Sequence, residues 1–74
     1  MNIPALHADC INMLESLRST YKLSPNATLG DIDCHPALTA SDESCLLTIK
    51  DEFQFLYWDM TIQEAKEAIA NEPL

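Results

Sequence analysis

Five side chains of this sequence are soft-metal ligands by type: His7, Cys10, Cys34, His35 and Cys45. His7 and Cys10 are three residues apart, which would place both on one face of a helix. Structural zinc sites, however, take their ligands in close pairs such as Cys-x2-4-Cys, and this sequence has none. We therefore expect no metal site, with Cys10 and Cys45 as small core residues and both histidines on the surface.

The sequence also contains fragments of catalytic and ion-binding patterns, none of them complete. A nucleophile built on Cys10 or Cys34 would lack an orienting group and an oxyanion-hole glycine, because the chain has one glycine in total. Asp31 and Asp33 are spaced like calcium ligands, but the residues that would complete a calcium loop do not follow. The single glycine also excludes a phosphate-binding loop. We expect a protein that is not an enzyme and holds no cofactor.

Acidic residues are concentrated in the middle of the chain. The formal net charge is −8, and residues 31–59 account for −6, because seven carboxylates are set against Lys50 alone. These carboxylates are Asp31, Asp33, Asp42, Glu43, Asp51, Glu52 and Asp59. Such an excess repels nucleic acids and anionic lipids and attracts basic protein surfaces. The simpler alternative is that the carboxylates only keep a small protein in solution.

Length and cysteine content indicate one small domain, residues 1–74, in the cytoplasm. A chain of 74 residues makes one domain with a thin core, and an apolar fraction of 47% is typical of folded proteins. Three cysteines are an odd number, unlike the framework of a secreted disulfide scaffold. Neither a secretory signal nor a long apolar run is expected here, so we predict reduced thiols in the cytosol.

Apolar residues in the first third of the chain recur at helical spacing. The stripe consists of Ile3, Leu6, Cys10, Met13 and Leu17, widened by Leu14 and Tyr21. Asn2 is a suitable N-cap, and Pro4 fits the first turn of a helix. The pattern predicts a helix from about residue 3 to about residue 21. Its near-heptad spacing suits the core of its own domain, which we favour, or a partner helix.

Residues 23–44 contain several residues that break regular structure. These are Pro25, Asn26, Gly30, Pro36 and the polar run 41–44. Leu29, Ile32 and Leu38 are expected to attach this segment to the core. An irregular stretch of about twenty residues is uncommon in a compact domain and is often functional. The segment is therefore a candidate binding loop.

From Cys45 the apolar pattern alternates as in a β-strand, and an aromatic run follows. We expect a hairpin over residues 45–58, with its turn at residues 50–52. The cross-strand pairs in this register are Ile49 with Phe53, Leu47 with Phe55 and Cys45 with Tyr57. The turn lacks the glycine that such loops favour.

A competing interpretation makes part of the same segment a helix. Ser41 would serve as its N-cap, and the helix would extend to Phe53. Leu46, Ile49 and Phe53 fit helical spacing as well as the alternating residues fit a strand. We favour the hairpin.

A capping box marks the last element. Thr61 and Glu64, in Thr-Ile-Gln-Glu, satisfy each other's free backbone amides at a helix start. The apolar residues that follow on one face are Ile62, Ala65 and Ile69. The pattern predicts a helix over about residues 62–71.

Together these elements predict an α+β fold. Both terminal helices would cover one face of a small single-layer sheet. The hairpin would form this sheet, with a possible third strand from residues 23–44. Two strands alone are marginally stable in water. We therefore expect either that third strand or a homodimer through the helical stripe or the hairpin edge.

Trp58 is the only tryptophan. The hairpin register places its side chain on one face of the hairpin and those of Phe53, Phe55 and Tyr57 on the other face. If exposed there, it would lie near Asp51, Glu52 and Asp59. An aromatic anchor ringed by carboxylates suits an arginine-rich surface. A register shifted by one residue would instead bury the ring.

The function predicted from these observations is that of a small acidic protein-binding module. It would block or regulate a basic, nucleic-acid-handling protein through the seven carboxylates and Trp58, without binding nucleic acid or membrane directly. In size and charge alone the chain resembles viral inhibitors of the anti-CRISPR and other DNA-mimicking types. Acyl carrier proteins share the length and acidity, but their Asp-Ser-Leu attachment site is absent from residues 28–48. The alternative is an assembly protein, as a homodimer or the minor subunit of a larger complex.

Overall fold

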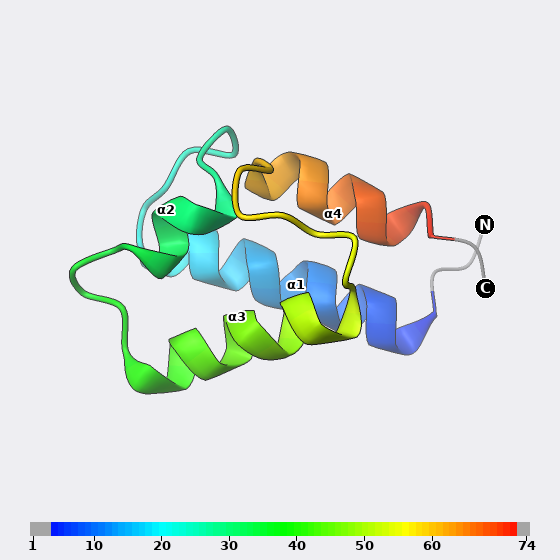
Figure 1. Cartoon of the computed structure of the whole chain (residues 1–74), viewed down its shortest axis with the longest axis horizontal. Coiled ribbons are helices and arrows are strands. Elements are labelled where there is room, and N and C mark those ends of the chain that lie inside the picture. The colour runs from blue at the N-terminus through cyan, green and yellow to red at the C-terminus, as the bar shows by residue number, and fades with distance from the viewer. Residues whose placement is uncertain (1–3, 73–74) are drawn as a thin grey trace.

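The computed structural model describes residues 4–72, and the regular structure in this range is helical (Figure 1). The helices are α1 (Ala5–Thr20), α2 (Leu29–Asp33), α3 (Ala40–Glu52) and α4 (Ile62–Ala70). The described residues contain one isolated antiparallel bridge, between Thr28 and Thr61, and no strand. The predicted α+β fold with its sheet is therefore wrong.

The longest helix, α1, lies between α3 and α4, and both of these run antiparallel to it (Figure 1). Helix α1 packs more extensively against α4 than against α3. The short α2 lies near the C-terminal end of α1 (Figure 1). An irregular segment, residues 54–60, leads from the end of α3 back to the start of α4, and we call it the strap.

All four helices and the segment after α3 contribute to one core. Its fully or almost fully buried residues are Cys10, Leu14, Leu17, Leu29, Ile32, Leu46, Ile49, Phe53, Leu56, Ile62, Ala65 and Ile69. Burial of a leucine or isoleucine side chain stabilises a fold by about 1.5–3 kcal/mol. One chain therefore closes a continuous core, and the incomplete sheet that suggested a dimer has no counterpart in residues 4–72.

The helix predicted near the N-terminus is confirmed as α1, with a different buried face. Its predicted cap, Asn2, lies outside the described residues, and Pro4 occupies the N-cap position instead of the first turn. Leu14 is fully buried, whereas Leu6 and Met13 are 48% and 36% exposed. The core-facing stripe is thus centred on Leu14, and part of the predicted stripe faces solvent.

The hairpin predicted over residues 45–58 is wrong, because α3 occupies its first half and the strap its second. Thr39 begins α3 by accepting a hydrogen bond from the backbone N–H of Asp42 at 3.1 Å. The competing helical interpretation is thus correct in type, with the cap two residues earlier than Ser41. A threonine cap contributes about 1 kcal/mol to a helix, and the predicted turn had no glycine to favour a hairpin.

Burial along α3 follows the helical period. Leu46 and Ile49 are fully buried and Phe53 is 2% exposed, while Leu47 is 47% exposed. A strand would have buried Leu47 and exposed Leu46, because its side chains alternate between faces. Burial in this segment therefore follows one apolar face of a helix and not the alternation of a strand.

The segment predicted to be irregular, residues 23–44, contains α2 and the first turn of α3. Leu29 and Ile32 are fully buried, and Leu38 packs against the core, so their predicted anchoring role is confirmed. The segment is therefore structured around a short helix, and it is not one long binding loop.

The capping box predicted at Thr61 is confirmed, and a second one begins α2 at Thr28. The two caps lie side by side in the antiparallel bridge. Next to it, the Gly30 N–H donates to the carbonyl of Trp58 at 2.8 Å. A Cβ added at Gly30 would lie 3.2 Å from that carbonyl oxygen, which explains the single glycine of the chain.

Candidate protein-binding surface

The residues predicted to bind a partner lie on three parts of the fold. Asp31 and Asp33 are on α2, Asp42 and Glu43 are in the first turn of α3, and Asp51, Glu52, Trp58 and Asp59 are at the end of α3 and on the strap. Thirteen helical residues extend about 20 Å. The two ends of α3 are therefore separate, and the fold does not gather all the predicted residues in one place.

Several of these carboxylates have local structural roles. Asp31 accepts a hydrogen bond from the Thr28 N–H at 2.9 Å, which completes the cap of α2. Asp42 accepts a hydrogen bond from the Tyr21 hydroxyl. Asp42 and Glu43 also lie in the first turn of α3, where the helix dipole favours negative charge. Helix stability accounts for these positions without a partner.

Asp51 and Glu52 have no such explanation. Both are exposed at the C-terminal end of α3, where the helix dipole disfavours negative charge. Within residues 4–72, neither carboxylate makes a hydrogen bond or an ion pair with another side chain. Burial is the main cause that raises the pKa of Cys10, and the negative charges of Glu52 and Asp9 raise it further. Asp9 was missed from the sequence because the first thirty residues sum to zero charge.

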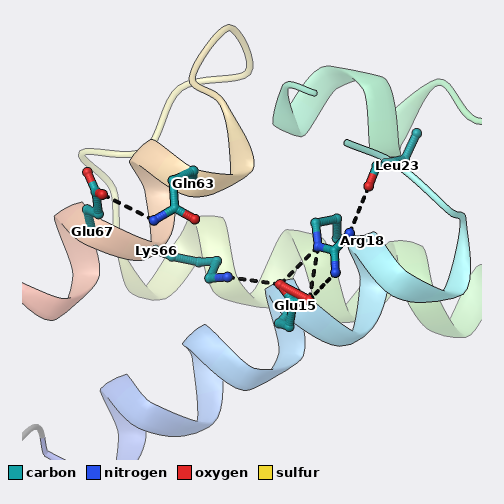
Figure 2. A network of polar contacts seen from close by, with 6 residues as sticks. All are labelled: Glu15, Arg18, Leu23, Gln63, Lys66 and Glu67. Atoms are coloured by element: carbon teal, nitrogen blue, oxygen red, sulfur yellow. Dashed lines mark hydrogen bonds and ion pairs between the residues drawn. The ribbon is translucent and has the colours of Figure 1, made fainter. Parts of the chain in front are cut away.

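Basic side chains are mostly committed to contacts within the molecule (Figure 2). Glu15 accepts hydrogen bonds from Arg18 Nε and from Lys66 Nζ, each at 2.9 Å. Arg18 Nη1 also donates to the carbonyl of Leu23 at 2.9 Å. Arg18 and Lys66 together lower the pKa of Glu15 to about 2. Two positive charges are thereby held on one carboxylate, which leaves fewer cations for the other acidic groups.

The Glu15 contacts predict a pH dependence of stability. Since the folded pKa lies below the ordinary value of 4.5, the contribution is complete above pH 4.5 and disappears as the pH falls toward 2. Urea unfolding should therefore find the wild type more stable than Glu15→Gln at pH 6, with the difference closing by pH 2. In a Lys66→Gln background the same difference should be smaller. A difference that is constant with pH would contradict the prediction.

Lys50 makes its contacts with the strap. Its Nζ lies 4.6 Å from the centroid of the Trp58 ring and donates to the carbonyl of Leu56 at 2.8 Å. A cation at this distance from an aromatic ring is attracted by the ring's negative face. Trp58 is consequently held beside α3, with 38% of the residue exposed.

Exposed apolar side chains accompany Trp58. Leu47, Phe55 and Tyr57 were predicted to line the buried face of the hairpin, yet they are 47%, 37% and 64% exposed. Leu47 precedes Asp51 by four residues, so the two share one face of α3. We name Leu47, Asp51, Tyr57, Trp58 and Asp59 the α3–strap surface. The helical interpretation of residues 41–53 would have predicted that the Leu47 side chain is exposed. The exposure of Phe55 and Tyr57 has no signal in the sequence.

The cysteines show no sign of nucleophilic activation. All three are free thiols, with Cys10 buried, Cys45 half-buried and Cys34 exposed. Burial is the main cause that raises the pKa of Cys10 and Cys45, which keeps both thiols protonated at neutral pH. The expected core position of Cys10 is confirmed, and Cys45 packs at the edge of the core.

His7, predicted to lie on the surface, is largely buried, so that prediction is wrong. Its Nε2 lies 2.8 Å from a carboxylate oxygen of Glu72, and its ring packs edge-on against Phe53 with centroids 4.9 Å apart. The side chain is 12% exposed, and its Nδ1 has no hydrogen-bond partner within residues 4–72. His7 thus ties α1 to the segments that follow α3 and α4.

Within residues 4–72, no group of three or more histidine, cysteine or acidic side chains is arranged to hold a metal ion. In the same range, no helix has the length and apolar character needed to span a membrane. Comparison with known proteins adds no assignment, because no family model, curated protein or solved structure matches the chain.

Proposed function

We propose that the protein is a small acidic binding module that docks on a basic protein surface through its α3–strap surface. The observation that carries this proposal is the position of Asp51 on this surface, with Glu52 next to it in the chain, because both are exposed at the end of α3, where negative charge weakens the helix. A partner of opposite charge supplies a reason for carboxylates that the fold itself does not need.

The surrounding surface supports the same proposal. Arg18 and Lys66 are bound to Glu15, and Lys50 is bound to the strap, so few positive charges remain to offset the 12 acidic side chains. Exposed carboxylates increase the rate at which a basic partner is encountered. The exposed parts of Tyr57 and Trp58 then supply apolar contacts of the kind that slow dissociation.

The class of partner follows from the chemistry of such a surface. A protein surface that binds nucleic-acid phosphates carries Lys and Arg side chains, and such a surface also attracts carboxylates. Occupation of that surface would block or regulate a nucleic-acid-handling protein, as DNA-mimicking viral inhibitors do. We place this interaction in the cytoplasm, consistent with three free thiols. The role is one of binding, without catalysis.

The test is capture of partners from the native cell with the full-length protein, followed by competition. Captured proteins should be basic, should be released as salt rises from about 0.05 to 0.5 M, and should be displaced by duplex DNA. If capture depends on salt but duplex DNA does not displace the captured proteins, the proposal that the partner handles nucleic acids is contradicted. Capture that is insensitive to both would contradict the electrostatic mechanism.

A second candidate function is assembly into a larger complex or a homodimer. The exposure of Leu47 and Tyr57, at 47% and 64%, favours it, because both could complete an apolar interface. Such an interface would persist at high salt, unlike an electrostatic one. Light scattering at high micromolar concentration would find a dimer that survives 0.5 M salt, whereas the acidic module should be monomeric.

A further inference from the structure

The strap carries a binding site for a positive charge, and a lysine of the protein itself occupies it. Lys50 lies in the last turn of α3, and its Nζ is 4.6 Å from the centroid of the Trp58 ring. The same ammonium group donates a hydrogen bond to the carbonyl of Leu56 at 2.8 Å. An aromatic ring and a backbone carbonyl thus bind one cation together.

Contacts that do not involve Lys50 hold this part of the strap in place. Leu56 is 1% exposed, so the residue that supplies the carbonyl is anchored in the core. The carbonyl of Trp58 accepts a hydrogen bond from the Gly30 N–H at 2.8 Å, which fixes the backbone of Trp58 to α2. Trp58 is nevertheless 38% exposed. A cation from another molecule can therefore reach the ring without unfolding the strap.

We propose that an arginine side chain of the basic partner replaces Lys50 on the Trp58 ring, and that Lys50 is an internal competitor for this arginine. The inference rests on the proposed function and names the group of the partner that the α3–strap surface recognises. A guanidinium group suits the site better than an ammonium group does. It is planar, it stacks on aromatic faces, and it is more weakly hydrated, so it loses less when it leaves water.

The charges around the site favour the exchange. Asp51 and Asp59 are exposed, and each is the next residue in the chain after one of the two residues in the cation–π contact. A guanidinium has five N–H donors, so it can bond to a carboxylate and to the Leu56 carbonyl at the same time. The displaced Lys50 ammonium remains at the C-terminal end of α3, where the helix dipole favours positive charge.

Peptide titrations of the full chain test the exchange. Octa-arginine is the probe, and octa-lysine is the control because it carries the same charge. Trp58 is the only tryptophan of the chain, so a change in tryptophan emission on binding reports contact at this ring. At about 0.05 M salt, octa-arginine should change the emission and should bind more tightly than octa-lysine.

Lys50→Gln removes the competing charge and keeps N–H donors for the Leu56 carbonyl. Lys22→Gln is the matched control, since it removes the same charge from an exposed lysine outside the α3–strap surface. Measured with labelled octa-arginine, Lys50→Gln should bind about two- to fivefold more tightly than Lys22→Gln, the effect of one cation–π contact at an exposed site.

Trp58→Leu separates the effect of the ring from that of local charge. In this background the advantage of Lys50→Gln over Lys22→Gln should disappear, because no ring is left to be freed. Trp58 and Lys50 both lie outside the buried core, so circular dichroism should show that all variants remain helical.

Three results would overturn the inference while leaving the proposed function intact. Octa-arginine binds without changing the Trp58 emission or no more tightly than octa-lysine; Lys50→Gln binds no more tightly than Lys22→Gln; or the advantage of Lys50→Gln persists in Trp58→Leu. In each case the acidic surface still binds a basic chain. If neither peptide binds at low salt, the proposed function fails, and the inference fails with it.

Discussion

Leu46→Ala should destabilise the protein by about 2–5 kcal/mol, because the Leu46 side chain is 0% exposed and its removal leaves a cavity in the core. A domain of this size has a total stability of roughly 4–11 kcal/mol, so the variant should be partly unfolded or should melt at least about 10 °C lower. Urea unfolding followed by circular dichroism measures the loss directly.

The neighbouring leucine provides the matched control. Leu47→Ala deletes the same atoms from a side chain that is 47% exposed, and its effect should stay within about 0.5 kcal/mol. A hairpin over residues 45–58 would reverse the order of the two variants, since Leu47 would then face the core. A larger loss for Leu47→Ala would therefore contradict the helical packing of α3.

Asp51→Lys should slow association with the basic partner by about tenfold or more at low salt, with a smaller effect at high salt. The carboxylate lies on the α3–strap surface, and its reversal opposes the attraction that precedes contact. The fold should not suffer, because a lysine near the end of α3 interacts favourably with the helix dipole. Stopped-flow or surface-plasmon measurements of the association rate test the effect once a partner has been captured.

Glu67→Lys on α4 separates a local effect from one of total charge. It changes the net charge by the same amount, but α4 and α3 lie on opposite sides of α1 (Figure 1). We expect near wild-type association for Glu67→Lys. If both variants slow association equally, the α3–strap surface is not the docking site, and if neither does, the interaction is not electrostatic.

Helices α1 and α4, which pack against each other, could be predicted from local sequence. Helix α1 was visible as a stripe at helical spacing, and α4 as a capping box followed by three buried apolar residues. Such signals involve residues within a few positions of each other, so they act before tertiary contacts form. The rotation of the α1 stripe was not predictable, since it depends on where α3 and α4 pack.

Residues 45–58 show the opposite case. Cys45, Leu47 and Ile49 satisfy the period of a strand, while Leu46 and Ile49 satisfy that of a helix. Local propensity is too weak to decide between them, and packing commonly overrides it. Burial of Leu46 and Ile49 against the rest of the core, together with the cap at Thr39, decided in favour of α3.

The sequence by itself determined the composition of the candidate surface: an acidic middle segment, a single tryptophan and few basic residues. Only the tertiary structure decided which charges remain free. Glu15 meets Lys66 across 51 positions, Asp42 meets Tyr21 across 21, and Cys45 meets Met13 across 32. Contacts over such separations depend on how whole helices pack, and no local pattern encodes them. The same packing left Asp51 and Glu52 exposed and without a side-chain partner in residues 4–72, because α3 ends there facing solvent.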